Sequence, residues 1–343
     1  MVKEAIRKPS GFLIRHALVE SGRYTDFLVH MLWRCAGIEV TIRDCLWTSS
    51  LPIQGGRSSI QHKVYKGIVN ICIMADLSSK AQVAKRLEGK VALITGAAQG
   101  IGACIAREFV HHGAKVVCVD IKQELGRSVC DDLGTENASF LYCDVTKESD
   151  VENAINHTIN KHGKLDIMIN NAGIVDEGKT SILDNDLCDF ERVMRVNLSG
   201  VFLGIKHAAR VMIPTRSGSI INLGSISGSI GGITSHSYSS SKHAVVGLTR
   251  NAAAELGKHG IRVNCLSSHV VLTPSSQNFF NFGEEGQSRV YTNLEGMVLK
   301  PEDLANAAVY LASDEARFMS GHNLMLDGGF TVTNPAFGLF SRF

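Results

Sequence analysis

Short apolar segments alternate with longer amphipathic segments from residue 90 to near the end of the chain. The short segments are apolar on both faces, which predicts strands of a parallel sheet covered by helices on both sides. Strands are expected at 91–94, 115–119, 139–142, 165–169, 219–223, 262–266 and 323–326. Helices are expected near 101–112, 122–132, 148–161, 186–211 and 237–256. This alternation predicts one doubly wound α/β domain, whose ligands bind beyond the carboxyl ends of the strands.

Residues 1–73 lack this pattern and carry ten Lys and Arg against five Asp and Glu. Met74 begins a polar leader that runs into the first strand. We therefore expect 74–343 to be the folded domain, and 1–73 to be an extension of uncertain structure that is disordered or not native. A plastid transit peptide is the alternative, but the five acidic residues weigh against it. No apolar stretch reaches the ~18 residues needed to span a bilayer, so we expect a cytoplasmic protein.

The charge and cysteine content of the chain argue against nucleic-acid, membrane and metal partners. The net charge of +2 gives neither the basic excess of a nucleic-acid-binding protein nor a polybasic membrane patch, so neither partner is expected. The nine cysteines include no Cys-x-x-Cys pair, and no metal site is expected. Several, such as Cys118, stand in apolar runs and are interpreted as buried hydrophobic residues in a reduced compartment.

A glycine-rich turn follows the first strand directly. Gly96, Gly100 and Gly102 permit a tight turn and close approach of a pyrophosphate, with Gln99 and Ile101 beside them. The helix that follows offers free N–H groups and its positive dipole end to phosphate. Because the turn lies between a strand and a helix, it predicts the dinucleotide site of a Rossmann domain.

Three later strand ends add candidate cofactor contacts. Asp120 ends the second strand, where a carboxylate can bind the adenosine ribose hydroxyls and would repel a 2′-phosphate. This favours NAD over NADP, although the nearby Lys122 opposes the preference. Asp144 and Val145 follow the third strand and are candidates for the adenine site. A helix N-cap is the alternative for both aspartates. The turn after the fourth strand supplies Asn171, Ala172 and Gly173.

Tyr238 and Lys242 are four residues apart in a predicted helix, which places both on one face. A nearby ammonium favours the phenolate, so this tyrosine is a candidate to take a proton from an alcohol as hydride leaves. Ser225 follows the fifth strand and is the candidate to bind the reacting oxygen, with Ser227 as the competing choice. Asn197 falls within a predicted helix, where its amide could bend the helix and hold a water next to Lys242.

These motifs, in this order, resemble the short-chain dehydrogenase/reductase superfamily over residues from about 86 to 330. The resemblance implies a catalytic tetrad of Asn197, Ser225, Tyr238 and Lys242, in which the serine positions the substrate oxygen and the tyrosine exchanges the proton. The lysine holds the nicotinamide ribose. Segments such as 162–168 and 327–337 resemble plant members of secondary metabolism, including secoisolariciresinol dehydrogenase and momilactone A synthase. Those members are NAD-dependent and mostly tetrameric, which implies a homotetramer or homodimer here.

The segment after the sixth strand departs from the family pattern. The family has Ser-Pro-Gly or Ser-Pro-aromatic, whereas this chain has Ser268 and His269 after Ser267. The family uses the backbone at Val271 and the hydroxyl at Thr273 for the nicotinamide carboxamide. Loss of the proline frees the backbone, so looser cofactor geometry is expected. His269 is a candidate substrate contact, with a surface position as the preferred interpretation.

Residues 275–300 hold three phenylalanines among Ser, Asn and Gly, which favours a mobile substrate lid with an apolar inner face, although a packed loop or subunit contact remains open. We therefore expect an NAD-dependent dehydrogenase that oxidises a ring-bound secondary alcohol of terpenoid, lignan or steroid type. The alternatives are an NADPH-dependent carbonyl reductase and a non-catalytic dinucleotide sensor. Asp120 opposes the first alternative, and the intact Ser225, Tyr238 and Lys242 oppose the second.

Overall fold

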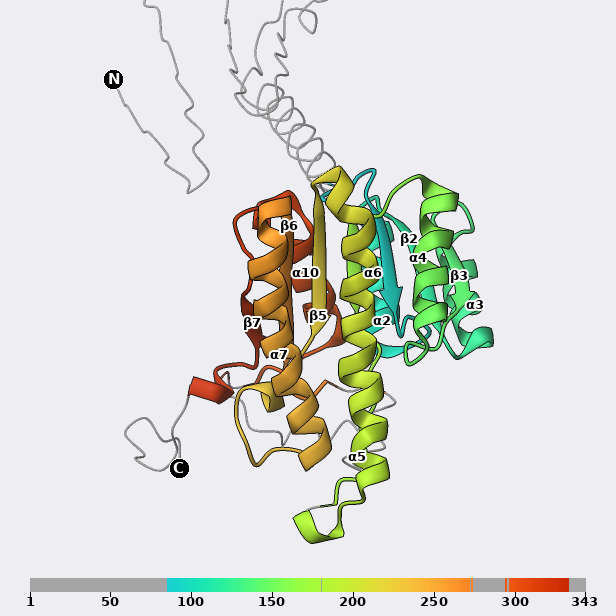
Figure 1. Cartoon of the computed structure of the whole chain (residues 1–343). Coiled ribbons are helices and arrows are strands. Elements are labelled where there is room, and N and C mark those ends of the chain that lie inside the picture. The colour runs from blue at the N-terminus through green and yellow to red at the C-terminus, as the bar shows by residue number, and fades with distance from the viewer. Residues whose placement is uncertain (1–84, 180, 272, 274–293, 295, 333–343) are drawn as a thin grey trace, which may run out of the picture. The chain divides into compact units, whose positions relative to one another are not determined.

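The computed structural model describes residues 85–179, 181–271, 273, 294 and 296–332. Within these residues seven parallel strands form one sheet in the order β3-β2-β1-β4-β5-β6-β7 (Figure 1). The strands are β1 (Val91–Thr95), β2 (Lys115–Asp120), β3 (Ala138–Tyr142), β4 (Ile167–Asn170), β5 (Gly218–Leu223), β6 (Ile261–Ser268) and β7 (Asn323–Leu326). The predicted doubly wound parallel sheet is confirmed, with each strand within two residues of its expected bounds. The predicted extension 1–73 lies outside the described residues.

Helices cover both faces of the sheet. They are α2 (Gly100–His111), α3 (Gln123–Leu133), α4 (Glu148–His162), α5 (Leu187–Met194), α6 (Gly200–Thr215), α7 (His236–Leu256) and α10 (Pro301–Ala312). Short helical turns are η1 (Ile182–Asp184), η2 (Arg195–Ser199), η3 (Ile226–Gly228), η4 (Gly257–His259), η5 (Asp314–Ala316) and η6 (Phe330–Val332). In Figure 1, α4, α6 and α7 lie in front of the sheet and α2 and α10 lie behind it.

Alternate residues of each central strand feed two separate apolar cores. Leu93 of β1 packs in the core beneath α4, α6 and α7, whereas its neighbours Ala92 and Ile94 pack in the core with α2 and α10. This follows from the two-residue period of a strand. Because both faces are covered, β1 is buried along its whole length, as its unbroken apolar sequence predicts.

Strand β1 pairs with both β2 and β4. The chain therefore winds outward in one direction from β1 through β2 to β3, and in the opposite direction from β4 to β7. A crevice forms at such a switch point, beyond the carboxyl ends of the strands. The fold therefore directs the ends of β1, β2, β4 and β5 towards one shared site.

The segment predicted as one helix near 186–211 is interrupted. α5 and α6 are joined by η2, a turn of π-helix that contains Asn197. π-Turns insert an extra residue into a helix and often occur at functional sites. The predicted distortion of the helix at Asn197 is therefore present.

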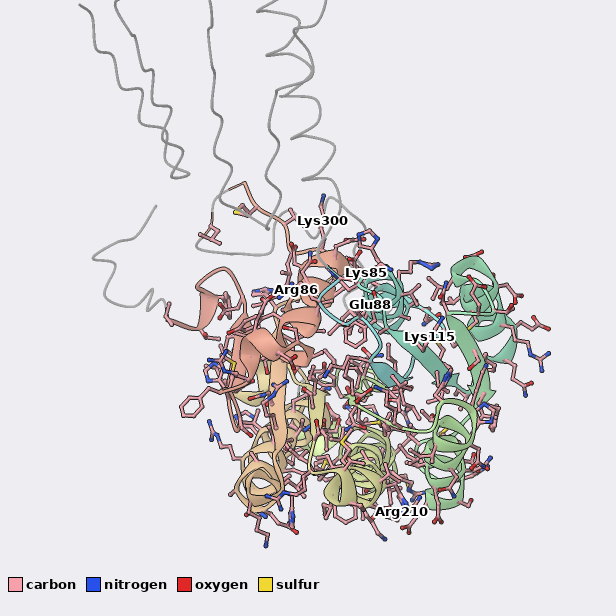
Figure 2. All side chains as sticks on the ribbon, turned by 90° about the horizontal axis from the view of Figure 1, so that it is seen from above. Lys85, Arg86, Glu88, Lys115, Arg210 and Lys300 are labelled. Carbon is pink, nitrogen blue, oxygen red and sulfur yellow. The ribbon has the colours of Figure 1, made fainter. Side chains whose placement is uncertain are left out.

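The amino-terminal ends of the strands lie opposite the crevice, and charged side chains surround them. Figure 2 shows Lys85, Arg86 and Glu88 together there. Arg86 pairs in a two-bond contact with Glu315, at 2.9 and 2.6 Å. Among the helices of the described residues, none is long and apolar enough to cross a membrane.

Candidate active site

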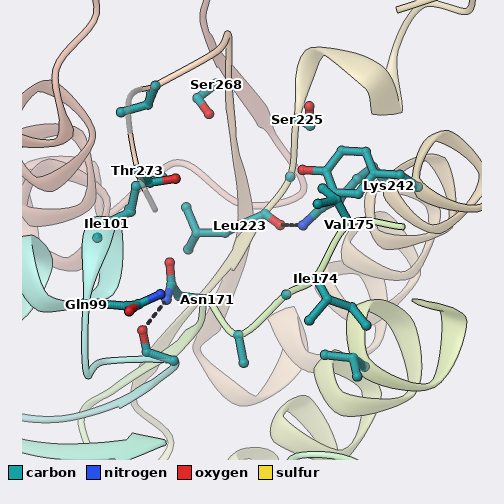
Figure 3. Close-up of a pocket in the computed structure, with 18 of the residues that line it drawn as sticks. Gln99, Ile101, Asn171, Ile174, Val175, Leu223, Ser225, Lys242, Ser268 and Thr273 are labelled. Carbon is teal, nitrogen blue, oxygen red and sulfur yellow. Dashed lines mark hydrogen bonds between the residues drawn. The ribbon is translucent and has the colours of Figure 1, made fainter. Parts of the chain in front are cut away.

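A cavity of about 400 Å³ lies at the carboxyl ends of the strands (Figure 3). It brings together nearly all of the predicted site residues from both halves of the sheet. Those that line it are Gly96, Gln99, Gly100, Ile101, Asp120, Asp144, Val145, Asn171, Ala172, Gly173, Ser225, Tyr238, Lys242, Val271 and Thr273. The two predicted residues outside its lining are Gly102 and Asn197, and each contacts residues that do line the cavity.

The glycine-rich turn is tightly packed. Gly96 has φ +66°, and a Cβ there would lie 2.8 Å from Ala172 Cα. A Cβ on Gly102 would lie 2.2 Å from the Gly96 carbonyl oxygen. No larger side chain fits at either position without moving the backbone. Gly102 therefore acts through packing, which keeps α2 close to β1.

Asn171 locks the turn to the fourth strand. Its Nδ2 donates to the carbonyl oxygens of Thr95 and Gly96, each at 2.9 Å. The Thr95 hydroxyl accepts from the backbone N–H groups of Asn171 and Ala172, each at 3.0 Å. Four bonds thus hold the ends of β1 and β4 in register across the switch point.

The first turn of α2 is open for an anion. Gln99 occupies the N-cap position, and its side chain makes no capping bond to this turn. Backbone N–H groups at a helix start lack intrahelical partners, and the helix dipole favours negative charge there. The chemistry of this donor set fits a pyrophosphate.

Asp120 is held rigidly at the end of β2. One carboxylate oxygen accepts from Ala98 N–H at 3.0 Å, and the other accepts from Lys122 N–H at 2.9 Å. The N-cap of α3 is Lys122, so the alternative interpretation of Asp120 as that cap is wrong. The Lys122 ammonium donates to the Gln99 side-chain oxygen at 3.1 Å. A fixed carboxylate and a basic group therefore lie side by side at this end of the cavity.

Asp144 braces the turn after β3. One of its oxygens accepts from both the N–H and the hydroxyl of Thr146, at 3.0 and 2.7 Å. The N-cap of α4 is Lys147, so Asp144 is not that cap. Cys143 lines the cavity beside it, and burial raises the pKa of this thiol to about 12.

Tyr238 and Lys242 lie one turn apart on α7, as their spacing predicts. The Lys242 ammonium is 5.5 Å from the centre of the Tyr238 ring and donates to the Leu223 carbonyl oxygen at 2.8 Å (Figure 3). Lys242 is 4% exposed. The ammonium and the phenol thus lie next to each other at the cavity. The pair is therefore suited to proton transfer.

Ser225 and Ser227 both line the cavity. The Ser225 hydroxyl accepts from Ser227 N–H at 3.2 Å, which orients it at the start of η3. Its hydrogen stays available for an acceptor in the cavity. The Ser227 hydroxyl is buried and has no hydrogen-bond partner within the described residues.

Asn197 is fully buried in the π-turn and ties three segments together. Its Oδ1 accepts from Ile174 N–H at 2.8 Å, and its Nδ2 donates to the Ile174 carbonyl at 2.9 Å. The same Nδ2 also donates to the Ser241 hydroxyl at 3.1 Å. Ile174 lines the cavity, so Asn197 positions the wall beside the catalytic helix.

The sequence patterns did not predict a hydrogen-bonded cluster that lies at the start of α7. Asp176 accepts from the Ser237 hydroxyl, and Ser235 caps α7 by accepting from Tyr238 N–H. Burial raises the pKa of Asp176, but hydrogen bonds from Ser237 and Ser235 outweigh it and lower the pKa overall. Serines before a helical run do signal an N-cap, whereas the distant aspartate gave no local signal.

The segment that departs from the family pattern forms part of the cavity. Ser268 and His269 line it together with Val271 and Thr273. His269 is 8% exposed and packs edge-on against Phe330, with ring centres 4.7 Å apart. The preferred interpretation of His269 as a surface residue is therefore wrong. The predicted lid at 275–300 lies mostly outside the described residues.

The described residues contain no group of three or more His, Cys, Asp or Glu side chains arranged to hold a metal ion. The expectation of a metal-free site stays a prediction.

A family model described as enoyl-(acyl carrier protein) reductase matches residues 96–331. The fold, the glycine-rich turn and the Tyr238–Lys242 pair agree with this match. The chain belongs to the short-chain dehydrogenase/reductase family, whose Rossmann fold indicates a nicotinamide dinucleotide cofactor.

The chain is similar to plant enzymes over three quarters of its length. It is 53% identical to secoisolariciresinol dehydrogenase of Forsythia intermedia over 262 residues, covering 75% of this chain and 95% of that one. It is 55% identical to a mitochondrial borneol dehydrogenase of Lavandula x intermedia, covering 75% and 96%. Momilactone A synthase of Oryza sativa subsp. japonica is 51% identical, with 75% and 95% covered. The predicted resemblance to plant secondary-metabolism members is confirmed.

A solved structure shares the fold. A short-chain dehydrogenase/reductase from Mycobacterium marinum is 34% identical and superimposes with a TM-score of 0.67, covering 73% of this chain and 98% of that one. The chain is thus an oxidoreductase of a family whose plant relatives act on alcohols.

Proposed function

We propose that this protein is an NAD-dependent dehydrogenase that oxidises a ring-bound secondary alcohol to a ketone. The observation that carries the proposal is the single cavity lined by Ser225, Tyr238 and Lys242 together with the glycine-rich turn and Asp120. One site thus combines a proton-transfer pair with a place for a dinucleotide. A sensor without catalytic activity would need only the second part.

The cofactor preference is supported by charge. The bound nicotinamide ring supplies the hydride acceptor. Asp120 would bind the ribose hydroxyls through its carboxylate, whose position is already fixed by two backbone N–H groups. A 2′-phosphate would meet this negative charge. Lys122 is the one observation that favours NADP and a carbonyl reductase, but its ammonium is engaged by Gln99.

The proposed chemistry assigns a task to each member of the tetrad. The Tyr238 phenolate accepts the proton of the alcohol as the carbon–hydrogen bond breaks. The buried Lys242 would hold the nicotinamide ribose through its ammonium, which also places a positive charge beside that phenolate. The Ser225 hydroxyl donates a hydrogen bond to the reacting oxygen. Asn197 keeps Ile174 and α7 in place through its three bonds.

The walls of the cavity favour an apolar substrate. Its lining beyond the cofactor contacts includes Ile174, Val175, Val196, Ile226 and Ile233. A cyclic terpenoid, lignan or steroid-like alcohol matches these side chains better than a sugar does. The names of the relatives point the same way, since they include dehydrogenases of secoisolariciresinol and borneol.

The test uses the full chain with a panel of cyclic secondary alcohols and either NAD or NADP. We expect reduced-cofactor absorbance to rise with NAD and at least one alcohol, and mass spectrometry to find the matching ketone. Turnover with NADP alone would favour the carbonyl reductase instead. Cofactor binding without turnover of any alcohol would contradict the proposal.

The assembly proposed is a homotetramer or homodimer. Phe202 on α6 is 50% exposed, and Leu187 at the start of α5 is 70% exposed. Apolar side chains left at a surface are available for subunit contacts. Light scattering that gives the mass of a monomer at micromolar concentration would rule the assembly out. A cytoplasmic location likewise stays a prediction.

A further inference from the structure

Three polar side-chain atoms are buried around the cavity without a hydrogen-bond partner among the described residues. They are the Ser227 hydroxyl, the Thr234 hydroxyl and the Nε2 of His269, and all three residues line the cavity. A buried polar atom that lacks a partner destabilises the protein, so native structures contain few of them. Three such atoms around one cavity indicate that a ligand supplies the missing partners.

His269 is the most informative of the three because its hydrogen can be placed. Its Nδ1 accepts from Val270 N–H at 2.6 Å. A nitrogen that accepts carries no hydrogen, so the hydrogen of the neutral ring is on Nε2. Nε2 is therefore a donor that requires an acceptor.

The surroundings of His269 keep the ring neutral and fixed. Burial lowers the pKa of His269, and the opposing charge of Asp327 only partly offsets this. The Asp327 carboxylate is already engaged by the N–H groups of Gly329 and Thr331 and by the Thr331 hydroxyl. The edge-on contact with Phe330 restrains the ring plane. The ring is thus held in one orientation.

The cavity wall also contains apolar side chains. Ile174, Val175 and Ile233 offer no hydrogen bond to a ligand. Ser227 lies two residues beyond Ser225, so a second polar group is also present on the side of the reacting serine. An alcohol with a single oxygen would satisfy the catalytic serine and tyrosine but leave Nε2 unpaired.

We propose that His269 is a specificity-determining residue that donates a hydrogen bond from Nε2 to a second oxygen of the substrate, a carbonyl, lactone or ether oxygen remote from the reacting hydroxyl. The inference rests on the proposed function and narrows its substrate class to cyclic alcohols with at least two oxygen functions. Ser227 is a secondary contact of the same polar subsite.

The test measures binding so that it does not depend on turnover. In a Tyr238→Phe background with NAD, calorimetry gives the Kd of three matched pairs of ligands. They are cyclohexanol with 4-hydroxycyclohexanone, borneol with 5-oxoborneol, and 5α-androstan-3α-ol with androsterone. We expect the ligand with the additional carbonyl to bind about fivefold to tenfold more tightly in at least one pair, as one net hydrogen bond provides.

Substitutions at position 269 test whether His269 causes this difference in Kd. His269→Phe keeps the aromatic contact with Phe330 and should remove the preference, whereas His269→Gln retains a donor and should restore much of it. Ser227→Ala should weaken it to a smaller extent. His243→Phe, at an exposed position of α7 outside the cavity, is the matched control and should leave every Kd unchanged.

Two results would overturn the proposal. One is that no pair shows a preference for the ligand with two oxygens. The other is that His269→Phe weakens NAD binding by the same factor as ligand binding, which would assign Nε2 to the nicotinamide carboxamide. If the preference is present but the unsubstituted enzyme turns over no alcohol, the proposed function fails while the polar subsite stands.

Discussion

At the scale of single residues, the site is built from charges and polar groups that the fold holds in fixed positions. The Asp120 carboxylate accepts from two backbone N–H groups, and the Lys242 ammonium donates to a backbone carbonyl. Neither needs to reorganise when a ligand arrives, which favours selective binding. Changes at these residues should therefore alter specificity and rate more than stability.

Asp120→Ser tests the cofactor preference. Serine retains an oxygen for the backbone N–H groups but removes the charge that repels a 2′-phosphate. One removed repulsion near a surface is worth roughly 1–4 kcal/mol, so the ratio of kcat/KM for NAD to that for NADP should fall about tenfold or more. Steady-state kinetics with both cofactors measure it. Asp131→Ser, at an exposed position of α3, is the control, and an unchanged ratio in Asp120→Ser would contradict the assignment.

Cys143 should be unreactive although it lines the cavity. Burial raises its pKa to about 12, and only the thiolate reacts with iodoacetamide. Near pH 8 we expect Cys143 to be alkylated at least tenfold more slowly than Cys188, which is exposed on α5. Peptide mass spectrometry over a time course gives both rates. Equal rates would show that the cavity is more solvated than the structure indicates.

At the scale of elements, the strands were predicted well and the joins between elements less well. A strand such as β1 is recognisable because its apolar residues are contiguous. The π-turn at η2 was not predicted as such, because its stabilising contacts come from Ile174 and Ser241, which are distant in the sequence. The burial of His269 was missed for the same reason, since Phe330 belongs to another segment.

Asn197→Ala tests the π-turn as a junction. The change leaves the backbone groups of Ile174 without the partners they now have. Unsatisfied buried groups cost about 1–3 kcal/mol each, so the free energy of unfolding should fall by at least about 2 kcal/mol. Urea denaturation measures it. Asn156→Ala, exposed on α4, should change it by less than about 0.5 kcal/mol.

Equal free energies of unfolding for Asn197→Ala and Asn156→Ala would show that Asn197 does not hold Ile174 and the cavity wall in place. We further expect Asn197→Ala to raise the KM for the alcohol, because Ile174 lines the cavity. A purely structural role elsewhere in the fold would lower the amount of active enzyme without changing KM.

At the scale of the whole molecule, the site lies where the topology of the sheet puts it. The chain reverses its direction of winding between β1 and β4, and the cavity opens at the carboxyl ends of the strands on either side. This much followed from the alternation of segments. Nearly all of the residues that the motifs predicted line the cavity. Most of these motifs follow directly after a strand, whereas Tyr238 and Lys242 lie on α7.

The substrate wall was the part that sequence patterns predicted least. Its residues come from several loops, and contacts such as that between Asp176 and Ser237 join segments whose spacing carries no signal. Side chains of this kind become interpretable only when tertiary contacts show which polar atoms remain unpaired.

Steady-state oxidation of a cyclic secondary alcohol with NAD, compared between Tyr238→Phe and Tyr310→Phe, tests the proposed mechanism most directly. Both changes remove one hydroxyl, but Tyr310 lies on α10 and does not line the cavity. We predict that kcat falls about 10²- to 10⁴-fold in Tyr238→Phe, the range that general acid–base catalysis provides, and stays near its original value in Tyr310→Phe. Equal activity in the two variants would show that Tyr238 does not transfer the proton.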